Sequence, residues 1–279
     1  MADHDHDPVL VTGCSSGIGR AAVEALLAAG HTVWATARRP ETLRDLAARG
    51  AHVTALDVTD EASMAAAVAE VESAHGAVGT LVNNAGYGEY GAVEEVEIDR
   101  VREMFETNVF GLARMCQLVL PGMRRAGRGR IVNVGSMGGR FTLPLGGYYH
   151  ATKYAVEALT DALRLEVRPF GIDVVLLEPG VTRSSFVEKS TGSAAMSGEP
   201  DSPYAAMRDS VATANTQAYT NRLMSASAQS VAEVVVKAVE AGRPRTRYLL
   251  TPAAKGMALT RTVGGDRVWD RLMAQQFGL

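Results

Sequence analysis

Short apolar runs alternate with longer amphipathic stretches along most of this chain of 279 residues. The runs have the length of strands and are continuously rich in Val, Leu and Ile, as in a parallel sheet covered on both faces. Regular alternation of such strands with helices is typical of repeated βαβ units. We therefore predict an α/β fold, a doubly wound sheet of seven parallel strands with helices on both faces. The expected strands are residues 8–12, 32–37, 52–56, 80–83, 130–134, 172–177 and 247–250.

Helices are expected between these strands, and no linker divides the chain. With 47% hydrophobic residues the chain can bury a substantial core, so we expect residues 1–279 to form a single domain. Residues 184–227 break the pattern with polar, weakly periodic sequence, which predicts a substrate lid or, alternatively, a loosely helical surface excursion. The expected helices are residues 17–29, 41–49, 61–75, 99–125 and 149–167.

Composition and charge exclude several classes of function. The 28 basic residues form no stripe and the net charge is −3, which argues against nucleic acid as a partner. Only Cys14 and Cys116 are present, so we expect a reducing compartment. No segment reaches the roughly 18 apolar residues of a membrane span, and the acidic tail at residues 1–7 is no signal sequence. We expect a cytoplasmic protein without a metal site, because the tail's Asp and His residues lack a second ligand cluster.

A glycine-rich turn joins the first expected strand to the first helix. Its glycines follow the spacing G-x-x-x-G-x-G. Glycines let the backbone turn sharply and approach a pyrophosphate, and the N-terminus of the next helix offers free N–H groups and a positive dipole end. Two serine hydroxyls add further donors. The predicted phosphate-binding residues are Thr12, Gly13, Ser15, Ser16, Gly17, Ile18 and Gly19.

Two arginines follow the second expected strand, where a dinucleotide-binding protein often carries an acid for the ribose 2′-hydroxyl. The chain has Arg38 and Arg39 there and no carboxylate. Guanidinium groups suit a 2′-phosphate, which a carboxylate would repel. This favours NADP over NAD, with capping of a surface turn as the alternative role of the arginines. Asp57, with Val58 beside it, ends the third strand and is expected to bind the adenine amine or else to cap the next helix with Asp60.

Ser136, Tyr149 and Lys153 form a candidate catalytic set. Tyr149 and Lys153 are four residues apart in an expected helix, so their side chains share one face and can converge on one substrate oxygen. The lysine ammonium and an oxidised nicotinamide would stabilise a phenolate and lower the tyrosine pKa from about 10. Tyr149 can then exchange a proton with the substrate oxygen while Ser136 polarises it. This pattern predicts nicotinamide-dependent interconversion of an alcohol and a carbonyl compound, with His150 lining the pocket.

Taken together and in this order, the motifs resemble the short-chain dehydrogenase/reductase family in its compact single-domain form. The resemblance covers nearly the whole chain and implies a Rossmann-type fold. Segments around residues 13–17, 135–139 and 245 are similar to the 17β-hydroxysteroid and retinol dehydrogenase branch. The motifs are the glycine turn, Asn83, Asn84, Ala85, Gly86, Asn108, Ser136, Tyr149 and Lys153.

The resemblance also implies roles for single residues. Asn83 would brace the sheet, residues 84–86 would border the adenosine ribose, and Asn108 would hold a water that links Lys153 to solvent. A homodimer or homotetramer is implied as well, and apolar faces at residues 101–120 and 155–165 would be buried by pairing.

A second segment corresponds to the family's contact with the nicotinamide carboxamide. It contains Pro179, Gly180, Thr182 and Ser184. The sequence departs from the family pattern here, since Thr182 replaces Val or Ile and Ser184 replaces Thr. The main contact is a backbone N–H, so Thr182 should still serve, and Ser184 keeps a hydroxyl.

The expected surroundings of the catalytic set are mostly apolar. Residues 140–147 lie between Ser136 and Tyr149, and methionines of the 184–227 stretch can adapt to varied substrate shapes. We predict a hydrophobic carbonyl or alcohol substrate, steroid-, retinoid- or acyl-like; for the methionines, a satellite core under the loop is the alternative. The other candidate lining residues are Tyr87, Phe186, Met196, Met207 and Met224.

Two other functions are considered. One is reduction of a 3-oxoacyl thioester, for which a basic cluster at residues 124–130 could bind an acyl carrier; a solvated helix end is the alternative for this cluster. The other is an NADP-binding sensor without turnover, which is disfavoured because Tyr149 and Lys153 are both retained.

Overall fold

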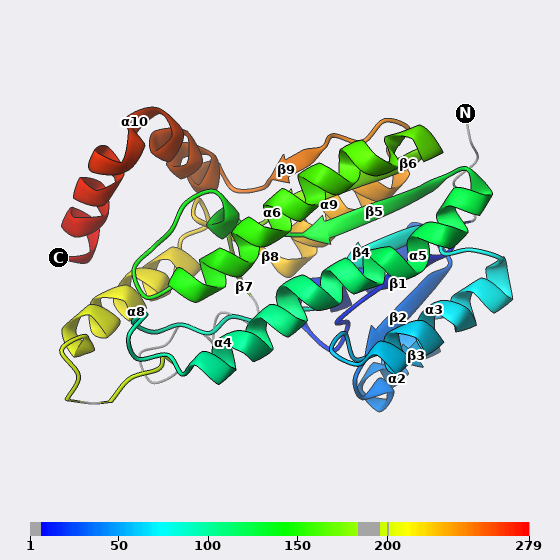
Figure 1. Ribbon diagram of the computed structural model, residues 1–279, viewed down its shortest axis with the longest axis horizontal. Coiled ribbons are helices and arrows are strands. Elements are labelled where there is room, and N and C mark those ends of the chain that lie inside the picture. Colours follow the sequence, from blue (N-terminus) through cyan, green and yellow to red (C-terminus); the bar gives the residue numbers. More distant parts are fainter. Residues whose placement is uncertain (1–6, 184–195, 200, 279) are drawn as a thin grey trace.

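A single parallel sheet forms the centre of the computed structural model, which describes residues 7–183, 196–199 and 201–278 (Figure 1). Within these residues the sheet has seven strands in the order β3-β2-β1-β4-β5-β6-β9. Each strand coincides with an expected one to within one residue at either end, so the predicted fold class is confirmed. The strands are β1 (Val9–Val11), β2 (Val33–Ala37), β3 (His52–Ala55), β4 (Thr80–Asn83), β5 (Gly129–Val134), β6 (Ile172–Glu178) and β9 (Arg247–Leu249).

The strand order reverses beside β1. This strand pairs with β2 on one side and with β4 on the other, so that Val9 lies opposite both Val33 and Thr80. In a doubly wound sheet, the carboxyl ends of the strands at such a reversal open a crevice that binds ligands. The expected glycine turn follows β1 and therefore lies at this crevice.

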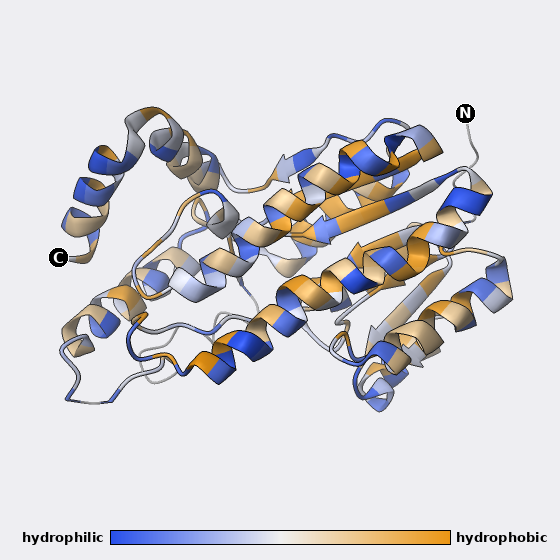
Figure 2. Ribbon diagram, in the orientation of Figure 1, coloured by the Kyte–Doolittle hydropathy of each residue, from blue (hydrophilic) through white to orange (hydrophobic). Residues whose placement is uncertain are grey.

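Helices cover both faces of the sheet, and Figure 2 shows hydrophobic residues along the strands beside helices of mixed hydropathy. One face packs against α1 (Gly17–Ala28), η1 (Pro40–Leu43), α2 (Arg44–Ala48) and α9 (Ala228–Glu240). The other packs against α3 (Glu61–His75), α5 (Leu112–Ala126) and α6 (Gly147–Val167). Burial of the apolar sides of these helices accounts for the two main core clusters.

The helix expected over residues 99–125 is interrupted. It consists of α4 (Ile98–Phe105), a π-helical segment η2 (Glu106–Gly111) and α5. A π-helical turn inside an α-helix often marks a functional site. Asn108 lies in this segment and is buried, so the irregular turn coincides with a residue singled out from the sequence.

The remaining short elements lie near the carboxyl ends of the strands or connect them. A separate parallel pair joins β7 (Val181–Arg183) to β8 (Ser225–Ser227). Two 3-10 segments are η3 (Met137–Gly139) and η4 (Arg168–Phe170). In the described part of the chain, no helix combines the length and apolar character needed to cross a bilayer.

The stretch at residues 184–227 contains regular structure that its weak periodicity concealed. Helix α8 (Ala205–Thr220) occupies much of it. Hydroxyl groups inside this helix donate to carbonyls one turn earlier, as Thr213 does to Asp209 and Thr216 to Ala212, so polar residues are accommodated without an apolar stripe. The proposed lid also includes residues 184–195 and 200, which lie outside the described residues, as does the tail at residues 1–6.

The chain ends in α10 (Pro252–Phe277), a helix without a counterpart among the expected elements. It bends at Gly265, whose φ of 66° is in the left-handed region that glycine tolerates. Trp269 of α10 packs against Phe141 and donates a hydrogen bond from its Nε1 to the carbonyl of Thr142. Phe141 and Trp269 belong to a third hydrophobic core cluster. Met196 is buried in this third core cluster, and Met207 packs against it.

The basic cluster at residues 124–130 lies at the wrong edge of the sheet to serve the crevice. It surrounds the start of β5, whereas the crevice lies at the carboxyl ends of the strands. Arg125 and Arg128 pair with Glu72 and Asp7. Arg130 is only 2% exposed, so it is a buried structural residue and cannot bind an acyl carrier.

Arg130 should contribute measurably to stability. It donates to the carbonyls of Ala238, Val239 and Ala241 at the end of α9 and pairs with Asp173. We expect Arg130→Met to lower the free energy of unfolding by about 1–3 kcal/mol, because buried carbonyls lose their donor. Urea denaturation measures the change, and Arg128→Met, which removes a more exposed ion pair, should cost only about 0–1 kcal/mol. Equal losses in the two variants would contradict this assignment.

Candidate active site

A cavity of about 1000 Å³ opens at the carboxyl ends of the strands. It is lined by the last residues of β2 and β5 and by the segments that follow β1, β2, β3, β4, β5 and β6. Most of the residues singled out from the sequence contribute to its wall. These are Gly13, Ser15, Ser16, Gly17, Ile18, Arg38, Asp57, Val58, Asn84, Ala85, Gly86, Ser136, Tyr149, Lys153, Pro179, Gly180 and Thr182. Ser184 and Phe186 lie outside the described residues.

The glycine turn brings backbone close to the cavity. Gly13 and Gly17 have φ of 72° and 60°, and an added Cβ on Gly13 would come within 2.8 Å of the Ala85 backbone. The first turn of α1 contains no acidic residue, so its positive dipole end and N–H groups face the cavity without a competing carboxylate. This wall fits the pyrophosphate of a dinucleotide.

Thr12 and Gly19 stand behind this wall. The Thr12 hydroxyl accepts hydrogen bonds from the backbone N–H groups of Asn84 and Ala85, at 3.0 Å each. The Asn84 side chain donates in return to the carbonyls of Thr12 and Gly13. A Cβ on Gly19 would lie 2.3 Å from the Asn84 amide nitrogen. Thr12 therefore joins the ends of β1 and β4, and Gly19 leaves room for the Asn84 side chain; neither residue lines the cavity.

The two arginines after β2 differ in position. Arg38 lines the cavity, whereas Arg39 does not. The Arg39 carbonyl accepts hydrogen bonds from the N–H and hydroxyl of Thr42 at the start of η1. The Arg39 backbone therefore takes part in the turn that begins η1.

Asp57 and Asp60 divide the roles that the sequence left open. Asp60 is the N-cap of α3, and its carboxylate accepts from the N–H groups of Ala62 and Ser63. Asp57 lines the cavity, and its carboxylate accepts from the Thr59 N–H and hydroxyl. Helix capping therefore falls to Asp60 and leaves Asp57 facing the cavity.

Ser136, Tyr149 and Lys153 converge on the cavity from two elements. Ser136 follows β5 and shares a hydrogen bond with the Tyr149 side chain on α6. Lys153 donates from Nζ to the carbonyl of Val134 at 3.1 Å, and its Nζ lies 5.9 Å from the centre of the Tyr149 ring. One helical turn thus places the phenol and the ammonium in the same wall, as their spacing predicted.

Burial dominates the protonation equilibria of this set. It raises the pKa of Tyr149, an effect that the hydrogen bond with Ser136 opposes, and it lowers the pKa of Lys153 to about 8. The lower tyrosine pKa expected from the sequence is therefore not a property of the chain alone.

Asn108 and His150 hold the backbone around the set. Asn108 accepts from the Tyr87 N–H and donates to the Tyr87 carbonyl and the Thr152 hydroxyl. His150 Nδ1 donates to the Gly138 carbonyl at 2.9 Å in the tautomer that leaves Nε2 to accept from the Leu143 N–H. Burial lowers the His150 pKa. With both ring nitrogens engaged, His150 braces the lining as expected.

Asn83 also has its expected structural place. It is buried, and its amide donates to the Asn133 side chain at 3.0 Å, which links β4 to β5. The sheet is therefore braced next to the crevice.

The outer wall of the cavity was not predicted from the sequence. Tyr90 packs against Tyr149 with ring centres 5.4 Å apart, and Asn215 enters the wall from α8. Glu89 and Arg100 also line it and form an ion pair. These residues were not predicted because they form no motif with a recognisable spacing in the sequence.

The expectation of an apolar lining holds only in part. Tyr87 and Leu143 line the cavity, but so do charged groups such as Glu89 and Arg100. Met196 and Met207 belong to the third core cluster instead, and Met224 does not line the cavity. The satellite-core alternative is therefore correct for Met196 and Met207.

A doubly wound sheet with a glycine turn and a Ser–Tyr–Lys set at its carboxyl edge defines a dinucleotide-dependent oxidoreductase. The chain belongs to the short-chain dehydrogenase family, whose model matches residues 7–194. It is accordingly an NAD(P)-dependent enzyme of that family.

Named relatives and solved structures agree with this membership. The chain is 31% identical to an NADPH-dependent 3-dehydrocapnine reductase of Ornithobacterium rhinotracheale, over 94% of both proteins. It is 40% identical to a 3-ketodihydrosphingosine reductase of Bacteroides thetaiotaomicron, but that match spans 64% of this chain and 65% of the relative's length. A short-chain dehydrogenase structure from Streptomyces avermitilis is 36% identical, with a TM-score of 0.81, over 96% of this chain and 97% of that one.

Two further similar structures hold different cofactors. A serine dehydrogenase is complexed with NADP⁺ and a Burkholderia phymatum dehydrogenase with NAD, each 26% identical to this chain. Their TM-scores are 0.76 and 0.79, and the matches cover 88% and 94% of this chain and 95% of each structure. The likeness supports a nicotinamide cofactor but does not choose between the two.

Proposed function

We propose that this enzyme uses NADP to interconvert a secondary or primary alcohol and its ketone or aldehyde on a hydrophobic substrate, with Tyr149 as general acid and base. The observation that carries the proposal is the convergence of Ser136, Tyr149 and Lys153 on one wall of a large cavity. The two named reductases support a carbonyl compound as substrate.

The chemistry follows from the positions of the three side chains. A bound nicotinamide supplies or accepts the hydride. In the reducing direction, Ser136 donates a hydrogen bond to the substrate oxygen, and the Tyr149 hydroxyl protonates that oxygen as negative charge develops. The Lys153 ammonium stabilises the phenolate that remains. Asn108, through the Tyr87 backbone and Thr152, holds the segment of α6 that carries Tyr149.

The test is consumption of NADPH against a panel of oxosteroids, retinaldehyde, acetoacetyl thioesters and small ketones, followed by the absorbance of the reduced nicotinamide. Turnover of a lipophilic ketone or aldehyde supports the proposal, and preferential turnover of the thioesters would support the alternative reductase. The buried position of Arg130 already weakens a carrier-docking role for its cluster. Tight NADPH binding without turnover of any compound would favour the sensor.

NADP preference rests on Arg38. We expect Arg38→Ala to raise the dissociation constant of NADPH about tenfold and to leave NADH nearly unchanged, because a charge-assisted contact with the 2′-phosphate is worth about 1.5 kcal/mol or more. Titration of protein fluorescence measures both constants.

Arg39→Ala is the matched control for Arg38→Ala. It removes an adjacent guanidinium that does not line the cavity, so it should change neither constant by more than about twofold. Equal weakening of NADPH and NADH by Arg38→Ala would show that Arg38 does not bind the 2′-phosphate.

We also propose a homodimer or homotetramer in the cytoplasm. Large apolar side chains remain exposed on the two segments expected to pair, including Phe110 on η2 and Leu159 and Leu165 on α6. Burial of such side chains between subunits would remove apolar surface from water.

A further inference from the structure

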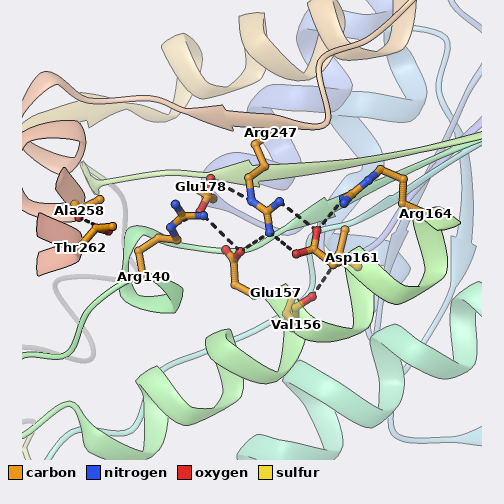
Figure 3. Close-up of polar contacts among 10 residues, drawn as sticks. Arg140, Val156, Glu157, Asp161, Arg164, Glu178, Arg247, Ala258 and Thr262 are labelled. Atoms are coloured by element: carbon orange, nitrogen blue, oxygen red, sulfur yellow. Dashed lines mark hydrogen bonds and ion pairs between the residues drawn. The ribbon is translucent and has the colours of Figure 1, made fainter. Parts of the chain in front are cut away.

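A cluster of charged side chains lies behind the cavity wall, where four segments of the chain meet (Figure 3). At its centre are Glu157 and Glu178, called here the carboxyl pair. Glu157 lies on α6 one turn after Lys153, and Glu178 is the last residue of β6. Both are buried, with Glu178 only 1% exposed. Neither residue lines the cavity.

Two arginines enclose the carboxyl pair. Arg247 of β9 lies 2.8 Å from Glu157 and 4.0 Å from Glu178, measured between nitrogen and oxygen atoms. Arg140, which follows η3, lies 3.9 Å from Glu157 and 3.7 Å from Glu178. Arg247 also pairs with the more exposed Asp161 at 2.7 Å. Each arginine therefore contacts both carboxyl groups, as Figure 3 shows.

The carboxyl pair includes two buried oxygen atoms that lack a hydrogen-bond donor among the described residues. Glu157 Oε1 and Glu178 Oε1 are buried, and neither accepts a hydrogen bond from any donor in the described part of the chain. Buried polar atoms rarely lack partners. Two neighbouring carboxylates offer only acceptors, so they cannot form a hydrogen bond with each other. A single proton held between them makes one carboxyl group the donor and leaves the other as its acceptor.

The pair contacts every segment that carries the proposed chemistry. A Cβ on Gly139 would lie 2.8 Å from Glu157 Cγ, so Glu157 packs directly on the turn that Ser136 begins. Glu178 immediately precedes Pro179, whose carbonyl accepts from the Met137 N–H at 2.9 Å. The turn after β5, the segment after β6 and the catalytic face of α6 are thus joined at one point.

We propose that the carboxyl pair holds a single shared proton and, through Arg140 and Arg247, positions the Ser136 turn and the 179–182 segment against the Tyr149–Lys153 face of α6. Glu157 and Glu178 are positioning residues, since they act through the segments they contact. The effect on turnover rests on the proposed function, whereas the shared proton does not.

The protonation of Glu178 supports this arrangement. Burial, followed by the hydrogen bond and charge of Glu157, raises its pKa to about 8 against the opposing charges of Arg140 and Arg247. The surrounding charged or titratable groups are Asp161, Arg164 and Tyr154 of α6, Arg140, Arg247, and Arg261 of α10, which faces Tyr154.

The raised pKa of Glu178 determines the direction in which the stability of the protein changes with pH. Between the ordinary value of 4.5 and about 8, the folded protein binds a proton that the unfolded chain releases. Stability conferred by this site therefore falls as pH rises through that window and is constant above it. Glutamine, which is neutral at every pH, should remove the dependence.

The experiment compares Glu178→Ala and Glu178→Gln with wild type. We expect Glu178→Ala to lower kcat about tenfold, because small displacements of reacting groups have large kinetic effects. Glu178→Gln should recover kcat to within about threefold of wild type, because the amide matches the size and donor capacity of a protonated carboxyl. From pH 5 to 8, Tm should fall more in wild type than in Glu178→Gln.

Asp173→Asn is the matched control. Asp173 lies on the same strand, β6, and pairs with a buried arginine, but at the opposite end from the cavity. This variant should keep kcat within about twofold of wild type and retain the wild-type dependence of Tm on pH, since its contacts involve neither member of the carboxyl pair.

The outcomes separate the two parts of the proposal. Unchanged kcat in Glu178→Ala would overturn positioning, and a Glu178→Gln protein as impaired as Glu178→Ala, with the wild-type pH dependence of Tm, would overturn the shared proton. If Glu178→Ala does not fold, Glu157→Ala removes the other member of the pair and tests positioning by the same loss of kcat, while Glu178→Gln still decides the shared proton. If the wild-type protein has no turnover, the proposed function fails. The dependence of Tm on pH then still tests the shared proton, and the NADPH dissociation constants of the variants still test the positioning of the 179–182 segment.

Discussion

Tyr149→Phe should lower kcat by about 10²–10⁴-fold while NADPH still binds with nearly wild-type affinity. The substitution removes only the hydroxyl that transfers the proton, and general acid–base catalysis contributes a factor of that size. The ring of Tyr149 packs on Tyr90, and phenylalanine preserves that contact. Steady-state turnover and fluorescence titration with NADPH measure the two quantities separately.

Tyr148→Phe is the control for this prediction. The Tyr148 hydroxyl donates to the Val93 carbonyl at an exposed position, so its loss should change kcat by no more than about twofold. Turnover retained in Tyr149→Phe, or lost equally in both variants, would overturn the assignment of Tyr149 as the acid and base.

Ser136→Ala should lower kcat by about 10²–10³-fold, the usual effect of removing one donor to a developing oxyanion. The same hydroxyl opposes the rise in the Tyr149 pKa that burial causes. Its loss should raise that pKa further, so the pH profile of alcohol oxidation, which needs the phenolate, should move to higher pH. Rates across a pH series measure both effects.

Ser136→Thr keeps a hydroxyl at the same position and should recover most of the activity. A profile that does not move in Ser136→Ala would show that the hydrogen bond to Tyr149 has no kinetic importance. An unchanged kcat would remove Ser136 from the proposed catalytic set.

Local patterns predicted the architecture because its elements are defined by short-range periodicity. The inner strands β1, β2, β4, β5 and β6 are almost wholly buried and rich in apolar residues, as expected for strands covered on both faces. The edge strands β3 and β9 are more exposed and more mixed in composition. The hydrophobic pattern did not predict α8, because hydroxyl groups such as that of Thr213 form hydrogen bonds within the helix and the helix needs no apolar stripe. It also missed the π-helical turn at Asn108, since one inserted residue leaves little trace in periodicity.

Some features of the candidate site could likewise be predicted from local sequence, whereas others depended on tertiary packing. The spacing of Tyr149 and Lys153 determines their shared helix face, because helix geometry is local. The different positions of Arg38 and Arg39, one lining the cavity and the other in a turn, depend on how η1 packs. For Met196 and Met207 the sequence left a substrate lining and a satellite core open, and packing in a cluster that includes Trp269 of α10 decides for the core.

The sequence by itself determined the seven strands, the glycine turn and the Ser–Tyr–Lys set, because these depend on hydrophobic runs, backbone freedom and helical spacing. Only the tertiary structure decided which charges are buried. Arg130, one residue of the basic cluster considered for carrier binding, is buried. Glu157 and Glu178 lie together although they belong to two elements whose residues share no motif. Burial and pairing depend on long-range packing, and they change both the pKa of a group and the role it can have.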